Sequence, residues 1–366
     1  MKKKVLHVSA GGLGHGGVST VIFSVVQSLY KHFDFSCVVF SRKLEREELF
    51  EQYGTLYRVN CYPKKGKRDY FEAITRPFKL YFGIKRICKK EKFDIIHCHN
   101  QRDQWVCLLA AKHASVPVRI AHSHNTNSPK KISLIEKKYK LFAPYIIKKT
   151  ATKLVGCSQQ ACEQFFVCNN FSVIHNSVDF NKFSLSKRLS HEGINFVHVG
   201  RFTYQKNQDF VLKTFAEVCK SIHNAKLFLV GFGTDAEVER LKLLIVNLGI
   251  EDSVELVPGD KVDVADYYAK SDYMIFPSRF EGFGIVLVEA QAMGVQCYVS
   301  ENIQPEVDVG LLEFLKLSDG PKKWADCIVS DIQNGRKGSC DVNKLSQYSN
   351  EVVCRRYADL YNGVNV

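Results

Sequence analysis

The stretch DYMIFPSRFEGFGIVLVEAQAM, residues 272–293, decides how this chain folds. Its apolar run 273–276 lies between Asp272 and Pro277, which predicts a short buried strand. A Gly282-Phe283-Gly284 turn follows, and the apolar segment behind it has the length of a helix. A buried strand, a glycine-rich loop and a helix in this order are typical of a parallel sheet, because parallel strands need crossover connections.

The same alternation extends over both halves of the chain and predicts an α/β protein with two Rossmann-like domains. Their parallel sheets should face a central cleft, because ligands of open parallel sheets bind at the carboxyl ends of the strands. A polar linker is expected near residues 176–194. Strands are expected at 5–10, 35–40, 94–99, 118–124, 153–157, 172–175, 195–199, 226–230, 253–256 and 272–277, and helices at 18–30, 105–113, 208–221, 235–248, 264–269 and 284–293.

The composition is that of an ordinary globular protein. Of 366 residues, 45% are hydrophobic and 24% are charged, which excludes disorder and collagen. The thirteen cysteines contain no Cys-x-x-Cys pair, which argues against a disulfide framework and common zinc motifs. No apolar run approaches the roughly 18–20 residues of a membrane-spanning helix, and the N-terminus lacks the features of a signal peptide. We therefore expect a cytoplasmic protein.

The net charge of +13 is concentrated in the first half of the chain. Residues 61–153 carry 22 Lys and Arg against 6 Asp and Glu, a local charge of +16, whereas the other residues carry 29 against 32, or −3. This excess indicates an anionic partner, such as a membrane surface, a nucleic acid or a phosphorylated substrate. A solvated basic surface that aids solubility is the alternative.

Gly12, Gly14 and Gly17 match the spacing of a dinucleotide-binding loop and lie between an expected strand and an expected helix. The acidic residue that binds the ribose in such proteins is missing, because the second strand ends Val38-Val39-Phe40-Ser41. What remains is a loop whose backbone N–H groups can approach a phosphate or a sugar closely. A tight turn without a ligand is the alternative.

Two carboxylates, Glu281 and Glu289, are separated by seven residues in the stretch quoted first. Glu289 lies in the middle of an apolar helix, where an unpaired charge is costly, so it should face a partner or a hydroxyl-rich ligand. The turn at 282–284 exposes backbone donors at a helix N-terminus, which suits a diphosphate.

These residues resemble the signature of the retaining glycosyltransferases of family 4, which have the GT-B fold and use nucleotide-activated sugars. The resemblance extends over nearly the whole chain, and the His-Ser-His-Asn segment 122–125 is similar to capsule and exopolysaccharide enzymes. One departure is Gly294-Val295-Gln296, where the family usually has Gly-x-Pro. Other pieces that agree in order and spacing are Gly11–Gly17, Asp94–His97 with His99, Arg119–His124, Val173–Asp179, and Val199–Arg201 with Lys206 and Asn207.

The resemblance implies how the donor would be bound. Arg201 and Lys206 would contact the diphosphate, and Gly16, Gly17 and the Gly282-Phe283-Gly284 turn would offer backbone groups to the donor. Two cations beside the leaving diphosphate stabilise the transition state more than the ground state. No metal and no other cofactor is therefore expected.

The resemblance also implies roles around the reacting sugar. Glu289 would bind the ribose hydroxyls and Glu281 the transferred sugar. His124, at the end of a strand of the first domain, would lie beside the acceptor and the reacting carbon and help to manage a proton near neutral pH. His122 and His99 are its close competitors.

Two basic segments, Tyr70–Lys92 and Lys130–Lys149, interleave lysine and arginine with aromatic residues. Such segments can lie against an anionic membrane and bring a lipid-linked, diphosphate-bearing acceptor to the first domain. Packing by the aromatic side with solvated lysines is the alternative. Nucleic-acid binding is not expected, because no recognition helix accompanies the charge.

The sequence thus predicts a retaining glycosyltransferase that moves a hexose or N-acetylhexosamine from a UDP-sugar to a hydroxyl of a lipid-linked glycan. The product would be a capsular polysaccharide, an exopolysaccharide or an O-antigen. The alternatives are a nucleotide-sugar epimerase of the same fold and a membrane-associated scaffold with a degenerate site. Residues 1–180 would bind the acceptor, residues 190–345 would bind the nucleotide sugar, and a helix within 346–366 would pack back on the first domain. The expected location is cytoplasmic, with peripheral binding at the inner face of the membrane.

Overall fold

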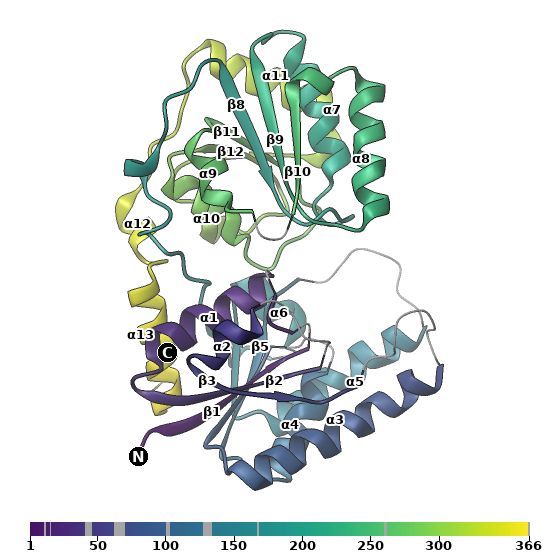
Figure 1. Cartoon of the computed structure of the whole chain (residues 1–366), viewed down its shortest axis with the longest axis vertical. Coiled ribbons are helices and arrows are strands. Elements are labelled where there is room, and N and C mark those ends of the chain that lie inside the picture. Colours follow the sequence, from purple (N-terminus) through teal and green to yellow (C-terminus); the bar gives the residue numbers. More distant parts are fainter. Residues whose placement is uncertain are drawn as a thin grey trace. The chain divides into compact units, whose positions relative to one another are not determined.

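The structure, a computed structural model, describes residues 1–364 apart from 11, 15, 41–45, 62–69, 100–102, 127–133, 167 and 260–261. For residues 70–74 and 134–141 it describes the backbone alone. The chain divides into two compact units (Figure 1). Unit 1 comprises residues 1–177 and 350–366, and unit 2 comprises residues 178–349.

Unit 1 is built on a sheet of seven strands, all of them paired in parallel. The strand order is β3-β2-β1-β4-β5-β6-β7. The strands are β1 (Lys3–Ser9), β2 (Phe33–Val39), β3 (Gly54–Arg58), β4 (Ile95–Cys98), β5 (Val118–Ser123), β6 (Lys153–Gly156) and β7 (Ser172–Val173).

Helices cover both faces of this sheet (Figure 1). α1 (Gly17–Leu29) and α13 (Asn350–Asn362) share one buried apolar core with β1, β2 and β4. α3 (Tyr70–Glu91), α4 (Gln104–Lys112) and α5 (Leu134–Thr150) pack on the opposite face. The shorter α2 (Glu47–Glu51) and α6 (Gln159–Phe165) complete the unit. The C-terminal helix α13 is therefore part of unit 1, although all of unit 2 precedes it in the sequence.

Unit 2 repeats the plan with a parallel sheet of six strands in the order β10-β9-β8-β11-β12-β13. α7 (Gln208–Cys219), α8 (Asp235–Leu248) and α11 (Gly320–Gln333) cover one face, and α9 (Val264–Ala269) and α10 (Ile285–Ala292) contact the same strands outside that core. A short helix α12 (Val342–Ser346) ends the unit. The strands are β8 (Ile194–Val199), β9 (Ala225–Gly231), β10 (Val254–Pro258), β11 (Tyr273–Phe276), β12 (Gln296–Ser300) and β13 (Leu312–Leu315).

In both sheets the strand order reverses beside the first strand of the unit. The reversal lies between β1 and β4 in unit 1, and between β8 and β11 in unit 2. The loops that leave two such strands lead to helices on opposite faces of the sheet, and a crevice forms between these helices at the carboxyl ends, where open α/β sheets bind ligands. In unit 2 the topology therefore predicts a ligand site at the loops after β8 and β11.

Three strands, β3, β12 and β13, were not predicted from the sequence. β3 and β13 are edge strands with half-buried or exposed residues, so neither has a continuous apolar run. β12 is buried but begins with Gln296 and ends with Ser300, whose polar side chains bond to the backbone of Gly338 and Ser278. Among the residues that the structure describes, no helix has the length and apolar character needed to cross a membrane.

Candidate active site

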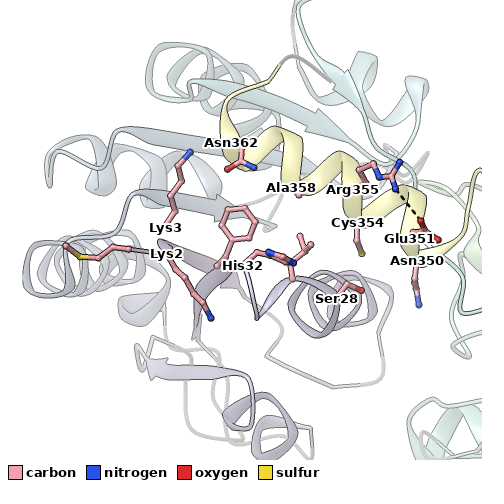
Figure 2. A pocket seen from close by; sticks show the side chains of 13 residues that line it. Lys2, Lys3, Ser28, His32, Asn350, Glu351, Cys354, Arg355, Ala358 and Asn362 are labelled. Carbon is pink, nitrogen blue, oxygen red and sulfur yellow. Dashed lines mark hydrogen bonds and ion pairs between the residues drawn. The ribbon is translucent and has the colours of Figure 1, made fainter.

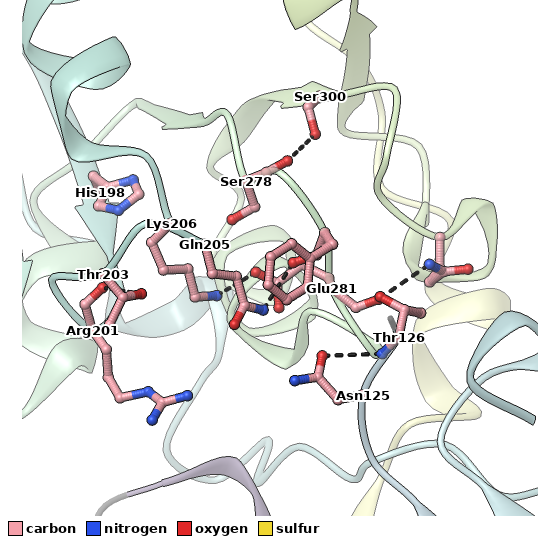
Figure 3. Close-up of polar contacts among 12 residues, drawn as sticks. Asn125, Thr126, His198, Arg201, Thr203, Gln205, Lys206, Ser278, Glu281 and Ser300 are labelled. Atoms are coloured by element: carbon pink, nitrogen blue, oxygen red, sulfur yellow. Dashed lines mark hydrogen bonds and ion pairs between the residues drawn. The ribbon is translucent and has the colours of Figure 1, made fainter. Parts of the chain in front are cut away.

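The loops after β8 and β11 meet through a buried ion pair. Nζ of Lys206 lies 2.7 Å from Oε1 of Glu281, and the two side chains are only 14% and 8% exposed. Nζ of Lys206 also lies 4.5 Å from the centre of the Phe276 ring. The absence of a side chain at Gly200 leaves room for the Lys206 stem, since a Cβ there would lie 3.1 Å from its carbons. Figure 3 shows Lys206 directed at Glu281.

Further hydrogen bonds fasten the same two loops to each other. Gln205 Nε2 donates to the carbonyl oxygen of Phe280 (2.8 Å), and the backbone N–H of Arg279 donates to the carbonyl oxygen of Gln205 (2.8 Å). The Arg279 guanidinium donates to Oδ1 of Asn207 (2.7 Å). Sequence reasoning missed Gln205 and Arg279, because their partners lie more than 70 residues away along the chain. Proximity to Lys206 and Glu281 was the only available signal.

Arg201 lies on the same loop as Lys206 but in a different environment. Its side chain is exposed and forms no ion pair with any residue that the structure describes. Its carbonyl oxygen accepts a hydrogen bond from Gln208 Nε2 (2.9 Å), which fixes the backbone at this point. Figure 3 shows the guanidinium directed away from the Lys206–Glu281 pair. Arg201 can therefore bind an anion without first breaking a contact.

The turn at 282–284 leads directly into α10. Gly284 precedes the helix with φ +88°, a left-handed conformation that strains any residue with a Cβ. No side chain of a described residue caps this N-terminus, and the first turn of α10 contains no acidic residue. The first N–H groups of a helix point outward with a partial positive charge, so this end of α10 is suited to an anion. Gly282 and Phe283, which precede it, are buried.

Glu289 lies on α10, one turn beyond this N-terminus, and its carboxyl has an unusual pKa. Burial raises the pKa of Glu289 to about 7, while Lys182 and the hydroxyl of Tyr268 act in the opposite direction. The Tyr268 hydroxyl donates to Oε2 of Glu289 across 3.5 Å. Because the carboxyl is partly buried and only weakly bonded, it retains acceptor capacity for a hydroxyl-bearing ligand.

In unit 1, Gly16 and Gly17 lie at the N-terminus of α1, and no side chain of a described residue caps this helix. A Cβ at either glycine would have no atom within 4 Å, and neither residue has a positive φ. Neither packing nor backbone strain within the described residues therefore requires glycine here. The close approach of a ligand to the backbone remains as a physical reason for glycine at both positions.

His124 lies in a group of neighbouring histidines in unit 1. Its Nε2 lies 2.8 Å from Nδ1 of His99, and its ring stacks on His122 at 3.8 Å between ring centres. Burial lowers the pKa of His124 to about 3, so the ring is neutral at pH 7 and does not titrate near neutrality. Sequence reasoning gave roles to His99, His122 and His124, quoted His97 in a matched motif without a role, and missed His7. The His-x-His pattern places His97 with His99 and His122 with His124 on one face of the sheet, but His7 belongs to no such pair.

A pocket of about 700 Å³ lies elsewhere in unit 1 (Figure 2). Lys2, Lys3 and Phe33 line it from the amino-terminal ends of β1 and β2, together with residues of α13 such as Glu351 and Arg355. Ligands of parallel α/β sheets bind at the opposite, carboxyl ends. We therefore do not assign the active site to this pocket.

Solved structures of other proteins share this architecture over their whole length. HepE of Anabaena, solved in complex with UDP and glucose, has a TM-score of 0.80 at 16% identity, covering 99% of this chain and 100% of that chain. The lipopolysaccharide outer core galactosyltransferase WaaB has a TM-score of 0.72 at 18% identity, covering 99% and 100%. Two parallel α/β sheets with these structural neighbours define the GT-B fold.

Comparison with known protein families and relatives identifies the family of this chain. Residues 15–182 match the family described as Glycosyltransferase Family 4, and residues 179–309 match Glycosyl transferases group 1. EpsF of Bacillus subtilis is 28% identical, covering 92% of this chain and 89% of EpsF. The capsular polysaccharide biosynthesis glycosyltransferase CapH of Staphylococcus aureus is 24% identical, covering 98% of both. The chain belongs to the group 1 glycosyltransferases of family 4, and the predicted family and fold are confirmed.

The Lys206–Glu281 pair can be tested by a double-mutant cycle. Lys206→Met and Glu281→Gln should each destabilise the protein by about 3 kcal/mol, because each leaves one group of a buried pair without its partner. The double variant should lose clearly less than the sum of the two. Urea denaturation followed by circular dichroism measures all three. Additive losses would show that the two side chains do not interact.

Glu289→Gln should stabilise the protein above pH 7 by up to about 3 kcal/mol and have little effect near pH 4.5. Because the pKa of the folded carboxyl is raised to about 7, the wild type loses stability as the pH rises from the usual pKa near 4.5 to about 7. Glutamine has no such titration. Urea denaturation of both proteins at about pH 5 and about pH 8 measures the difference. A difference that stays constant with pH would contradict the raised pKa.

Proposed function

We propose that this glycosyltransferase moves a hexose or N-acetylhexosamine from a UDP-sugar to a hydroxyl of a lipid-linked glycan, with retention of the anomeric configuration. The observation that carries the proposal is the Lys206–Glu281 pair next to the uncapped N-terminus of α10. It combines a cation, a carboxylate and backbone N–H donors in the two loops where the strand order reverses. A nucleotide sugar needs these groups for its diphosphate and its sugar hydroxyls.

In this proposal unit 2 binds the donor. The α10 N-terminus and Arg201 contact the diphosphate, and Glu289 accepts hydrogen bonds from the ribose hydroxyls. Glu281 orients the transferred sugar, and Lys206 shares its charge between Glu281 and the diphosphate. HepE, whose fold this chain shares, was solved with UDP and with UDP-glucose, which supports a UDP-linked donor.

Loss of the sugar from the diphosphate concentrates negative charge on the departing oxygens. Arg201, Lys206 and the helix N-terminus stabilise that charge more in the transition state than in the ground state, and this difference lowers the barrier. Neutral His124 contributes a hydrogen bond beside the sugar rather than a positive charge. Retention then follows from attack of the acceptor hydroxyl on the face that the diphosphate leaves. The bond between the sugar carbon and the diphosphate oxygen breaks, the glycosidic bond forms, and the departing diphosphate oxygen takes the hydroxyl proton, so we assign no protein nucleophile.

In the same proposal residues 1–180 bind the acceptor, residues 190–345 bind the donor, and the helix within 346–366 supports the acceptor-binding part. One relative, from Escherichia coli, is named UDP-Gal:alpha-D-GlcNAc-diphosphoundecaprenol alpha-1,3-galactosyltransferase; it is 28% identical over 62% of this chain and 63% of its own length. A diphosphate on the acceptor lipid also suits the local charge of +16 in residues 61–153.

The relative CapH is described as a capsular polysaccharide biosynthesis glycosyltransferase, which supports a role in the synthesis of such polymers. We propose a role in capsular polysaccharide, exopolysaccharide or O-antigen biosynthesis, on the cytoplasmic side and peripheral to an anionic membrane. Within the described part of the basic segments, Phe78, Phe82 and Tyr145 are exposed large aromatic residues. Aromatic and basic side chains together suit the membrane interface.

Transfer from radiolabelled UDP-sugars to lipid-linked glycan acceptors tests the proposed function. Lys206→Ala and Glu281→Ala should each lower turnover by about 100-fold or more, because each removes a group from the charge stabilisation of the transition state. Lys213→Ala, which removes an exposed lysine of α7 in the same unit, should leave turnover unchanged.

Other outcomes would identify one of the two alternative functions. Conversion of the donor sugar to its epimer without an acceptor would identify an epimerase. Retention of the function in cells by both site variants would identify a scaffold. Folding of each variant is checked by circular dichroism, so that lost turnover is not confused with lost structure.

A further inference from the structure

Five histidines of unit 1 and one tyrosine of α13 form a continuous hydrogen-bonded chain. His124 Nε2 lies 2.8 Å from His99 Nδ1, and His99 Nε2 lies 2.9 Å from His7 Nδ1. The Tyr361 hydroxyl lies 3.5 Å from His7 Nε2 and 2.8 Å from His97 Nδ1. This hydrogen-bonded chain ends at His122, whose Nδ1 lies 3.1 Å from His97 Nε2.

All five rings are neutral. Burial lowers the pKa of His7 and His124 to about 3 and holds the pKa of His97, His99 and His122 well below the usual value. The contacts agree with this, because a nitrogen-to-nitrogen hydrogen bond needs a lone pair on one of the two rings. Each neutral ring therefore has one N–H and one bare nitrogen, and the protonated nitrogen defines the tautomer.

The orientation of the rings ties their tautomers together. Every link joins Nδ1 of one ring to Nε2 of the next, and Tyr361 continues the order between His97 and His7. If one ring carries its proton on Nδ1, it donates to Nε2 of its neighbour, whose own proton must then be on Nδ1. Among the described residues the Tyr361 hydroxyl contacts only His97 Nδ1 and His7 Nε2, so its single proton is used only if it accepts from one ring and donates to the other. The five rings consequently share one tautomer, either all Nδ1–H or all Nε2–H.

The surroundings of His122, at one end of the hydrogen-bonded chain, determine which of the two tautomers is favoured. His122 Nε2 is buried and has no hydrogen-bond partner among the residues that the structure describes. The Nε2–H state would leave a buried N–H there without an acceptor, whereas the Nδ1–H state leaves only a bare nitrogen. Buried N–H groups without an acceptor are the rarer of the two defects in protein backbones, and leaving a buried donor unpaired costs about 1–3 kcal/mol.

We propose that all five histidines carry their proton on Nδ1, so that His124 presents an N–H donor at Nδ1 and keeps its only bare nitrogen in the bond from His99. His124 Nδ1 has no hydrogen-bond partner among the described residues, and the ring is partly exposed. It can donate to an oxygen of a bound sugar or phosphate but cannot accept a proton from the acceptor hydroxyl. This role of His124 rests on the proposed function, whereas the shared tautomer does not.

A metal site is the competing interpretation of the same cluster. Ring nitrogens of His7, His97 and His99, and of His99, His122 and His124, lie within 4.8 Å of one another. Both groups need His99, whose two nitrogens already take part in hydrogen bonds. The rings of His122 and His124 stack at an angle of 26°, so they lie face to face rather than pointing at one metal ion. These contacts favour the hydrogen-bonded chain.

Long-range proton–nitrogen NMR of the full chain labelled with ¹⁵N-histidine tests the proposal, because protonated and bare ring nitrogens resonate far apart. The five rings, assigned by single His→Gln variants, should show protonated Nδ1. Free neutral histidine in water favours Nε2–H, so the exposed His32 should show that form in the same spectrum. Protonated Nε2 on the five rings, or a mixture among them, would overturn the proposal. So would movement of their resonances on addition of one equivalent of Zn²⁺, which would reveal a metal site.

Two substitutions at His99 connect the tautomer to the reaction. His99→Asn keeps an N–H that can donate to His124 Nε2, so the His124 tautomer should remain Nδ1–H and turnover should fall less than threefold. His99→Leu removes that donor, and His124 should revert to Nε2–H while turnover falls at least tenfold. An unchanged His124 tautomer in His99→Leu would contradict the positioning role of His99. If the tautomers behave as stated but no donor is turned over by the wild type, the proposed function fails and the hydrogen-bonded chain stands.

Discussion

The carboxyl ends of parallel strands gather at one edge of a sheet, and the candidate site depends on this constraint. Where the strand order reverses between β8 and β11, the loops from these two strands meet with no strand between them. Lys206 and Glu281, 75 residues apart in the sequence, thereby form an ion pair. The same rule in unit 1 brings His7 on β1 next to His97 on β4. One topological feature thus produces a charged cluster in unit 2 and a neutral cluster in unit 1.

The two clusters differ in charge because burial has a different consequence for each. Lys206 and Glu281 are buried together, so each compensates the cost of removing the other from water. The histidines have no carboxylate in their chain, and burial therefore keeps them uncharged. Arg201, which is exposed, contributes a cation at no desolvation cost. In these loops unit 2 consequently holds a buried ion pair and an exposed cation, whereas unit 1 holds uncharged rings joined by hydrogen bonds.

Sequence patterns predicted the βα units well where a short apolar run was followed by a glycine turn, as in residues 272–293. They failed for β12, whose terminal polar residues are satisfied by partners from other parts of the chain. The matched motifs located Lys206, Glu281 and Glu289, but the ion pair between the first two was not predicted, since spacing does not encode a contact between separate loops. The packing of a helix within 346–366 on the first domain was predicted, but the contact of Tyr361 with the histidines was not, since helix packing alone does not specify which side chain reaches which ring.

The central claim is that the loops after β8 and β11 bind the diphosphate of a nucleotide sugar. A crystal structure of the chain with UDP tests it most directly. The account predicts both phosphorus atoms at the N-terminus of α10, with their oxygens within hydrogen-bond distance of the first backbone N–H groups and of the side chain of Arg201 or Lys206. Phosphorus atoms located at the amino-terminal edge of either sheet, or beyond reach of both cations, would contradict it.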